Sequence, residues 1–562
     1  MLSKILFSIL SLSFVGLVSS SFGQENVQLE KAKQELENRG EVYFCFLIPG
    51  TYSLSWLSNQ LSVDKVKGDT VFAYANASQF ESFHSLGIDY TILIPPSLCV
   101  QKQGSLKTTQ EESWQNYPTY NTYIEMMGQF IKDHPEICSL VEIGESIGGK
   151  KILAVKISDN VSEDETEPEV FYTSTMHGDE PSGFVLMLRL IDYILQNYSV
   201  NDQITYLVDN EEIYINPLAN PDGLYFLSDT SVYGAKRFNL NNVDLNRNFP
   251  DIDGTFYPDI QPENQQMIDF MQHRNLVLSA NFHDGEEVVN YPWDRWIRRH
   301  PDNDWFIHIS REYADTVHKY ATYGYMTFLN NGITNGYDWY EVTGGRQDYV
   351  TYFLHGREVT IELTQIKFPV GNELLQLWNS NRNSLINYLN NCFKGIKGIV
   401  QDAVTGESLK ALISIDNHDA DNSFVYSDSV TGVFYRMLQA GTYEITFSSD
   451  GYDTKTIEAL VPENGQINLD VLLSHGALDF WVSPNPVTEK LNIKFSEAIT
   501  DQIIVQLFDI TGRLVLNKTY KITDSNLLNV ETGSLGNGVY IVHVSGNQIN
   551  KSVKLVYTPI RP

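Results

Sequence analysis

The chain has 562 residues and a formal net charge of -31, with 39 Lys and Arg residues against 70 Asp and Glu residues. This acidic balance argues against a nucleic acid partner and modestly favours cationic ligands, although the solubility of a secreted protein explains it equally well. The length is too great for one hydrophobic core and indicates about three to five folded units, and a hydrophobic content of 42% excludes a largely disordered chain.

Residues 1–24 have the features of a secretory signal peptide. Lys4 precedes an apolar run from Ile5 to Val18, and Ser-Ser-Ser-Phe-Gly-Gln follows it. Because no second apolar span occurs, we expect a protein that leaves the cytoplasm and has no transmembrane segment. The four cysteines leave room for one disulfide whose pairing the sequence does not fix, and they form neither a disulfide scaffold nor a zinc knuckle: Cys45, Cys99, Cys138 and Cys392.

Residues 25–112 alternate apolar runs with helical patterns and predict a small α+β module. Strands are expected at residues 42–48, 70–74 and 90–94, with helices between them, which is consistent with a ferredoxin-like arrangement. The module contains no convergent cluster of titratable residues, so its role as a propeptide or as an accessory domain stays open. A polar stretch, residues 101–112, separates it from the next unit.

Residues 113–393 predict one large α/β domain in which helices flank a mixed open sheet. A strand that begins at Val170 breaks at Gly178 and precedes a helical pattern from about Pro181 to Tyr198. The other segments expected here are strands at residues 152–157, 212–216, 276–281 and 358–363 and a last amphipathic helix at residues 372–391.

Two histidines and a glutamate follow these predicted strands. His177 and Glu180 lie on the strand-to-helix turn, where open α/β sheets place their chemistry, and His283 comes just after another strand. Two imidazoles and a carboxylate are a typical set of three protein ligands for catalytic zinc, which keeps a fourth position open. Each residue alone is more often a helix cap, a solvated side chain or a buried histidine with ordinary partners, so the rest of the chain must decide.

Two further features of this domain suggest chemistry. Arg237 and the segment 244–250 put several Arg and Asn donors in one loop, and a guanidinium group binds a carboxylate with two hydrogen bonds. Glu362 lies in an otherwise apolar strand, where burial raises a carboxyl pKa and suits a general base. An Asn-rich turn with a solvated Arg, and a salt-bridged Glu at a strand end, would explain the same residues without any chemistry.

Six separated motifs in this domain resemble those of the zinc metallocarboxypeptidases, or funnelins, in the same order along the chain. The resemblance covers residues 117–391 and is greatest to the branch that contains carboxypeptidases D, E, M and N. The motifs are His177-Gly-Asp-Glu180, Asn220-Pro-Asp-Gly223, residues 237–250, residues 279–283 with 290–294, residues 332–340 with 344–348, and Glu362 with Lys367-Phe-Pro369.

The resemblance implies a catalytic role for five residues. His177, Glu180 and His283 match the ligands of one zinc ion, Zn2+. Glu362 matches the general base that takes a proton from water and passes it to the leaving amine. Arg237 matches the residue that stabilises the oxyanion of the tetrahedral intermediate.

The resemblance also implies a substrate pocket. Asn246 and Arg247 match the pair that binds the terminal carboxylate, and Tyr340 matches the mobile tyrosine that closes over the substrate. Asp294 and Gln347 match residues that line the pocket for a C-terminal Lys or Arg.

One residue of the pocket motif departs from the family pattern. Arg346 stands where relatives commonly carry Met, and a guanidinium group that pointed inward would pair with Asp294 and oppose a basic substrate. We therefore expect cleavage that releases Lys or Arg, with broader or apolar specificity as the rival. A zinc amidase or deacylase, a peptidase of cell-wall peptides and a non-catalytic surface binding protein also remain open at this point.

The two C-terminal units are predicted to be small β-sandwich domains. Residues 394–474 resemble the transthyretin-like domain that follows the catalytic domain in the same branch, through residues 398–402, 431–436 and 440–446. Residues 475–562 resemble the C-terminal sorting domain of the type IX secretion system. That resemblance implies a secretion-machinery partner and a location outside, or on the outer surface of, a Gram-negative Bacteroidetes-type cell.

Overall fold

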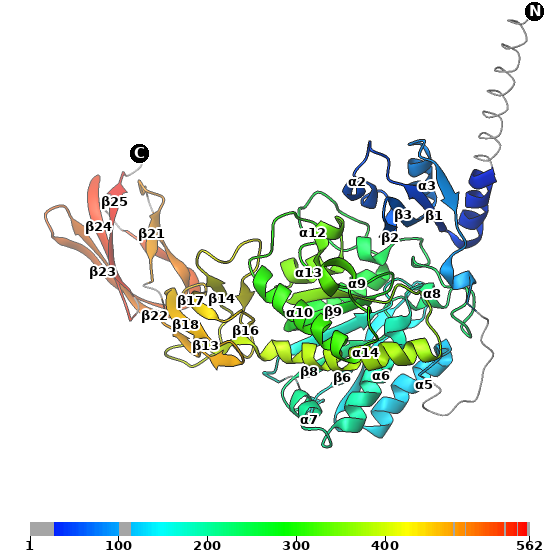
Figure 1. Ribbon diagram of the computed structural model, residues 1–562. Helices are drawn as coiled ribbons and strands as arrows, with labels where there is room; N and C mark the ends of the chain where they lie inside the picture. The colour runs from blue at the N-terminus through cyan, green and yellow to red at the C-terminus, as the bar shows by residue number, and fades with distance from the viewer. Residues whose placement is uncertain are drawn as a thin grey trace, which may run out of the picture.

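The computed structural model describes residues 27–100, 114–163, 165–475, 478–488, 490–532, 535–547 and 549–558. The expected signal peptide and the polar stretch 101–112 lie outside these residues. Figure 1 shows a small N-terminal module on one side of a large α/β unit and the two C-terminal β units on the other. Among the described residues, no helix is long and apolar enough to cross a membrane, and all four cysteines are free.

The described part of the large unit is built on an eight-stranded mixed sheet in the order β11-β10-β12-β9-β7-β8-β6-β5. Its central strands β12, β9, β7 and β8 run parallel. Strands β5 and β6 pair antiparallel with their neighbours, whereas β10 is antiparallel to β12 and parallel to β11. This confirms the predicted fold class. The strands are β5 (Cys138–Glu145), β6 (Lys151–Ile157), β7 (Glu169–Ser174), β8 (Glu212–Asn216), β9 (Leu276–His283), β10 (Glu287–Tyr291), β11 (Ile333–Asn335) and β12 (Arg357–Leu363).

Helices cover both faces of this sheet, and the central strand β7 is apolar on both sides. In β7, Val170 and Tyr172 join the core under α6 and α14, whereas Phe171 joins the core under α9 and α13. The helices are α5 (Tyr120–Asp133), α6 (Ser182–Asn197), α7 (Asp202–Val208), α8 (Pro221–Leu224), η2 (Leu245–Arg247), α9 (Pro262–Gln272), α10 (Asn303–Tyr320), α11 (Phe328–Gly332), α12 (Gly336–Trp339), α13 (Arg346–Phe353), α14 (Asn372–Leu389) and η3 (Asn390–Phe393).

The N-terminal module is a four-stranded antiparallel sheet in the order β2-β3-β1-β4, which is the ferredoxin-like order. The sequence analysis missed strand β2, because Ser62-Val-Asp-Lys-Val-Lys67 has only two apolar residues. Residues 27–39 are helical. The other elements are β1 (Val42–Leu47), α2 (Leu54–Ser58), β2 (Ser62–Lys67), β3 (Thr70–Ala75), α3 (Ala77–His84), β4 (Tyr90–Ile92) and η1 (Pro96–Leu98).

The two C-terminal β units differ in how they join the rest of the molecule. The first, here called the middle sandwich, has its own core but also sends Val433, Tyr435 and Met437 into the core of the large unit. Its strands are β13 (Gly395–Asp402), β14 (Leu412–Ile415), β15 (Val425–Tyr426), β16 (Val433–Arg436), β17 (Gly441–Ser448), β18 (Lys455–Val461), β19 (Gln466–Asn468) and β20 (Val471–Leu473).

The second β unit has a separate apolar core and a five-stranded sheet in which the long strands β22 and β23 pair. In the described ranges, its core shares no residue with the cores of the large unit or the middle sandwich. The strands are β21 (Phe480–Ser483), β22 (Lys490–Asp509), β23 (Leu514–Glu531), β24 (Gly538–Ser545) and β25 (Asn550–Tyr557).

The separation of these cores predicts two different truncation outcomes. Ending the chain after residue 474 should leave the thermal unfolding midpoint of the remainder within about 2 °C of the full chain's corresponding transition. Ending it after residue 393 should lower that midpoint by more than about 5 °C, because three buried side chains leave the core of the large unit. Differential scanning calorimetry of the three forms tests this, and equal midpoints for the two truncations would contradict it.

Candidate metal centre and substrate pocket

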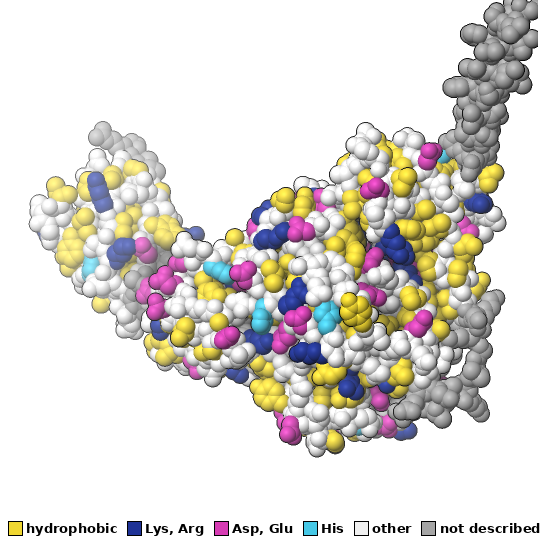
Figure 2. Space-filling model, in the orientation of Figure 1, with side chains coloured by type: hydrophobic (Ala, Val, Ile, Leu, Met, Phe, Trp, Pro, Cys, Tyr) yellow, Lys and Arg dark blue, Asp and Glu magenta, His cyan; other side chains and the backbone are white. Residues whose placement is uncertain are grey.

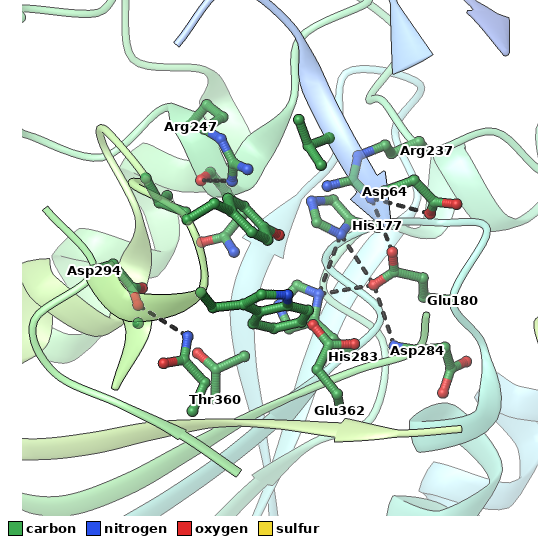
Figure 3. Close-up of a pocket in the computed structure, with 17 residues that line it drawn as sticks. Asp64, His177, Glu180, Arg237, Arg247, His283, Asp284, Asp294, Thr360 and Glu362 are labelled. Atoms are coloured by element: carbon green, nitrogen blue, oxygen red, sulfur yellow. Dashed lines mark hydrogen bonds and ion pairs between the residues drawn. The ribbon is translucent and has the colours of Figure 1, made fainter. Parts of the chain in front are cut away.

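The candidate site lies at the carboxyl ends of the parallel strands β7, β9 and β12. His177 and Glu180 are on the turn after β7, and His283 is the last residue of β9. Strands β9 and β12 pair in register, so that Glu362 stands opposite His283. Figure 3 shows the three candidate ligands pointing toward one another, with Glu362 next to His283. The sheet topology therefore gathers four residues that are up to 185 positions apart in the sequence (362 minus 177).

The three candidate ligands converge on one point. The Nδ1 atoms of His177 and His283 lie 3.0 and 2.8 Å from Oε2 of Glu180, and 3.1 Å from each other. All three side chains are buried. Three buried acceptor atoms so close together are unfavourable without a shared cation, and the set of two nitrogens and one oxygen fits zinc.

The tautomer of His177 is set by a carboxylate behind it. Nε2 of His177 lies 2.9 Å from Oδ1 of the buried Asp244. Because the carboxylate accepts, Nε2 carries the proton and the lone pair of Nδ1 faces the centre. The amide group of Asn281 lies 2.9 Å from Nε2 of His283 and holds the second ring. Neither partner was predicted from the sequence, although both Asp244 and Asn281 lie within the family motifs.

Arg237 is fixed by two carboxylates of the same site. Its Nη1 donates to Oε1 of Glu180 at 2.9 Å and its Nε donates to Oδ2 of Asp244 at 3.1 Å. Lys367 is a second buried cation here, 2.8 Å from Asp179 and 3.3 Å from Glu180. The sequence analysis gave Lys367 no role. These cations compensate the negative charge of the buried carboxylates around the centre.

Glu362 has the surroundings expected of a proton-transfer group. It is half-buried, and within the described residues its Oε2 atom has no hydrogen-bond partner. Loss of hydration raises the pKa of Glu362 well above its ordinary value, and the carboxylates of Glu180 and Asp284 raise it further. A metal cation at the centre would oppose these effects and favour the carboxylate form.

A narrow cavity joins the metal centre to the predicted substrate residues. Asn246, Arg247 and Tyr340 line it together with Glu362. Within the described residues, Nε and Nη2 of Arg247 are buried and have no partner, while its Nη1 donates to the backbone oxygen of Asn246. Arg247 therefore offers two free donors in the position of a carboxylate receptor.

Asp294 lies on the opposite side of this cavity from Glu180 (Figure 3). Its Oδ1 accepts from Asn290 Nδ2 at 2.9 Å and from Gln347 Nε2 at 3.1 Å. Burial raises its pKa to about 6, and the nearby Arg247 opposes that rise. The structure thus brings the two residues that were predicted to line the pocket together, but only Asp294 lines the cavity, and Gln347 lies behind it.

Arg346 does not reach Asp294. Its Nη2 lies 3.0 Å from Oε2 of Glu358, and its guanidinium group lies over the ring of Phe171 at 5.0 Å. Arg346 and Glu358 are both fully buried. Alternate residues of a strand point to the same face, so Glu358 lies on the face of β12 that also carries the cavity residue Thr360. Glu358 is therefore placed near the pocket, where it can pair with Arg346. Arg346 neutralises Glu358, and within the described residues Asp294 has amide partners but no ion-pair partner.

The N-terminal module reaches into the cavity. Val63 and Asp64 of strand β2 contribute to its lining, and a β-bulge between β2 and β3 occurs at Asp64. Asp64 lies 2.5 Å from Lys367 and 4.0 Å from Arg237, and it accepts a hydrogen bond from Tyr43 at 3.0 Å. About 30 Å³ of the cavity is accessible, which accommodates water but no peptide.

Comparisons with known proteins agree with this geometry. The profile described as "Zinc carboxypeptidase" matches residues 123–384, and carboxypeptidase E of Caenorhabditis elegans is 33% identical over 398 residues, covering 62% of this chain and 84% of that protein. The chain belongs to the zinc carboxypeptidase family. The profile described as "Secretion system C-terminal sorting domain" matches residues 482–558 of this family member.

Further relatives of this zinc carboxypeptidase belong to the branch that the motifs indicated. The carboxypeptidase N catalytic chain of Rattus norvegicus is 32% identical over 398 residues, covering 63% of this chain and 86% of that one. Human carboxypeptidase D is 35% identical over 370 residues, and the match covers 62% of this chain but 26% of that longer protein. A crystal structure of carboxypeptidase A from Helicoverpa armigera aligns with a TM-score of 0.49 at 18% identity, covering 62% of this chain and 98% of that one.

The contact between Asp244 and His177 predicts a specific loss of zinc affinity. Replacing Asp244 by Asn keeps the side-chain shape but removes the charge that orients and polarises the ring, so zinc affinity should fall about 10- to 100-fold. Competition with a zinc-chelating dye measures the affinity directly. Asp259→Asn, which changes an exposed carboxylate on a nearby loop, is the control. Equal affinity of the Asp244 variant and the unmodified protein would refute this prediction.

Proposed function

We propose that this chain is a secreted zinc carboxypeptidase that removes a C-terminal Lys or Arg from peptides and proteins. One observation supports the proposal most strongly. The free guanidinium donors of Arg247 share a narrow cavity with Glu362, Asp294 and the convergent ligand set. A peptide whose terminal carboxylate binds Arg247 therefore brings its last peptide bond to the metal centre.

Each residue of the site then has one task. Zinc, held by His177, Glu180 and His283, would supply the positive charge that polarises water and the substrate carbonyl. Glu362 takes a proton from the attacking water and delivers it to the leaving amine. Arg237 donates to the developing oxyanion.

Three residues restrict the reaction to the end of a chain. Arg247 binds the α-carboxylate together with Asn246, and Tyr340 closes over the substrate. A free donor pair of this kind favours an exopeptidase over an amidase, whose substrate has no free terminal carboxylate. Glu362 has a carboxylate oxygen without a hydrogen-bond partner in the part of the chain that the structure describes. This favours an enzyme over a surface binding protein, because binding alone needs no general base.

The preference for a basic residue rests on the charge of Asp294. Two neutral amides hold this carboxylate, and Arg346 is engaged by Glu358. A substrate ammonium or guanidinium group would then bring a full positive charge to Asp294, while Arg247 is engaged at the substrate carboxylate. Burying the substrate cation there is favourable only because the carboxylate compensates its desolvation.

We assign the N-terminal module the role of a propeptide that keeps the enzyme latent. Asp64 and Val63 occupy space in which substrate must bind. The module also contacts the loops that would handle substrate: Ser58 donates to the backbone oxygen of Glu341 at 2.8 Å, and Tyr340 packs against the module's core. Access would require the module to move away or to be removed.

The C-terminal sorting domain supports delivery of the enzyme to the outside of the cell. Its apolar core is independent, so its removal after transport would leave the catalytic unit intact. We propose that the enzyme works extracellularly or on the outer surface of a Gram-negative Bacteroidetes-type cell, on the C-termini of peptides and proteins.

Blocked dipeptides that end in Arg, Lys, Leu or an amidated residue test the reaction and its specificity. The processed, zinc-loaded protein should release Arg and Lys, and a chelator should abolish the release. Glu362→Gln should lower kcat about 100- to 10,000-fold because the general base is lost, and Asp294→Asn should reduce selectivity for Arg over Leu. Release of Leu in preference to Arg by the unmodified protein would reject the basic specificity, and release only from the amide would reject the carboxypeptidase reaction.

Latency predicts that Asp64→Ala activates the unprocessed, zinc-loaded protein. Loss of a buried ion pair weakens an interface by about 2–5 kcal/mol, so activity on the Arg dipeptide should rise at least about tenfold. Lys367 keeps two carboxylate partners in this variant, which preserves the folded site. Asp69→Ala, an exposed carboxylate of the same hairpin, should have no effect. Full activity of the unprocessed protein before any substitution would refute latency.

A further inference from the structure

The segment that begins at Asp294 ends in a buried ionic cluster under the middle sandwich. We call residues 294–302 the specificity segment, because Asp294 is its first residue. Its last residue, Asp302, is buried and is contacted by Arg357 at 2.7 Å, by Arg436 at 2.7 Å and by His418 at 2.7 Å. Arg436 and His418 belong to the middle sandwich, so one carboxylate links the two units.

A single loop of the middle sandwich supplies His418 and makes further contacts at this junction. This loop, residues 417–423 between β14 and β15, is called the clamp loop here. Its Asp421 accepts two hydrogen bonds from Arg298, at 2.7 and 3.0 Å, and its Asp419 holds Arg436 at 2.7 Å. Asn417, Asp421 and Asn422 have positive φ angles of 60°, 50° and 61°, a tight conformation that brings the loop's polar groups to the specificity segment.

The backbone of the clamp loop is also held by the large unit. Arg357 Nη2 donates to the backbone oxygen of Ser423 at 2.7 Å, and the ring of His355 lies within 2.9 Å of the backbone oxygen of Asn422. Arg357 is the first residue of β12, the strand that carries Glu362. Figure 2 shows basic, acidic and histidine side chains gathered on the face where the middle sandwich meets the large unit.

The specificity segment connects this cluster to two parts of the substrate pocket. The clamp loop holds Arg298, and the next residue is Arg299. Arg299 donates to Asn335 at 2.7 Å and to Asp338 at 2.5 Å. Asn335 is the N-cap of helix α12, and Asp338 lies within the helix. Tyr340 follows the last residue of the helix directly. The neighbouring arginines therefore tie the clamp loop to the tyrosine that closes the pocket.

The other connection leads to Asp294. The ring of the fully buried Trp293 packs on His300 at 4.9 Å, and Nδ1 of His300 accepts a hydrogen bond from the backbone N–H of Asp302 at 2.9 Å. A displacement of Asp302 is transmitted through these packed groups to the residue before Asp294.

We propose that the clamp loop of the middle sandwich is a positioning element for substrate recognition, which holds Asp294 and helix α12 in place through the specificity segment. This inference rests on the proposed function, because Asp294 matters most when the substrate ends in a basic residue. Neither Arg298 nor Asp421 touches the substrate. Their effect should appear in binding of the substrate side chain, which contributes equally to the ground state and the transition state, and hence in KM rather than kcat.

The test uses the pair Arg298–Asp421 in the processed, zinc-loaded protein. Asp421→Asn and Arg298→Gln should each raise KM for an Arg-ending dipeptide about threefold to fivefold, with kcat within about twofold and the thermal unfolding midpoint within about 2 °C. The double reversal Arg298→Asp with Asp421→Arg should restore most of the loss. Glu312 of helix α10 forms an ion pair with Lys394 elsewhere in the same junction. The control variant Glu312→Gln, which removes this pair, should leave KM unchanged.

Two results would overturn the proposal. One is an unchanged KM in both single variants, whatever happens to the unfolding midpoint, because a merely structural junction lowers stability without altering substrate binding. The other is an equal rise in KM for Glu312→Gln. Arg436→Lys, which keeps the charge but not the two-pronged contact with Asp302 and Asp419, should raise KM further.

The proposed function is tested separately in the same measurements. The unmodified protein's selectivity among dipeptides ending in Arg, Lys and Leu tests the basic preference. If Leu is preferred, the basic specificity fails, and the variants compared on the Leu substrate still show whether the clamp loop positions the pocket.

Discussion

The site depends on the convergence of three buried acceptor atoms that repel one another unless a cation lies between them. Parallel pairing of β7, β9 and β12 brings His177, Glu180 and His283 to one edge of the sheet, and no single local segment supplies the set. The surrounding polar groups maintain this arrangement: Asp244 orients a ring, and Lys367 and Arg237 balance the carboxylates. The core of the large unit thus holds the ligands in a geometry that they would not adopt alone.

The same strands also explain how chemistry and specificity share one cavity. Along β12, alternate residues face the same side, so Glu358, Thr360 and Glu362 form a polar row on a strand whose other side is core. Glu358 is neutralised by Arg346. Thr360 lines the cavity, and Glu362 stands opposite His283. The alternation of one strand therefore places an ion-paired residue, a cavity-lining residue and the proposed general base in one row.

The sequence was sufficient to predict strands β6, β7, β8, β9 and β12, since they are apolar runs with few competing patterns, but not β5, β10 and β11. The motifs were sufficient to predict the family. Two features could not be predicted for physical reasons. Arg346 and Gln347 are consecutive helical residues about 100° apart, so only the tertiary position of Glu358 decides which of them faces the pocket. Asp64 lies in a polar strand, and its partner Lys367 is 303 residues away (367 minus 64).

The contacts of the N-terminal module also stabilise part of the large unit. Glu41 of the module accepts hydrogen bonds from the backbone N–H groups of Arg237 and Phe238, and Arg39 donates to the backbone oxygen of Ala235. These contacts with the N-terminal module help to hold the loop that carries Arg237 in place. They would be lost if the module were removed as a propeptide. Under that proposal, removal of the module would trade conformational stability for access to the cavity, and the processed form would unfold sooner than the intact one. Such an enzyme would carry a limit on its own period of activity.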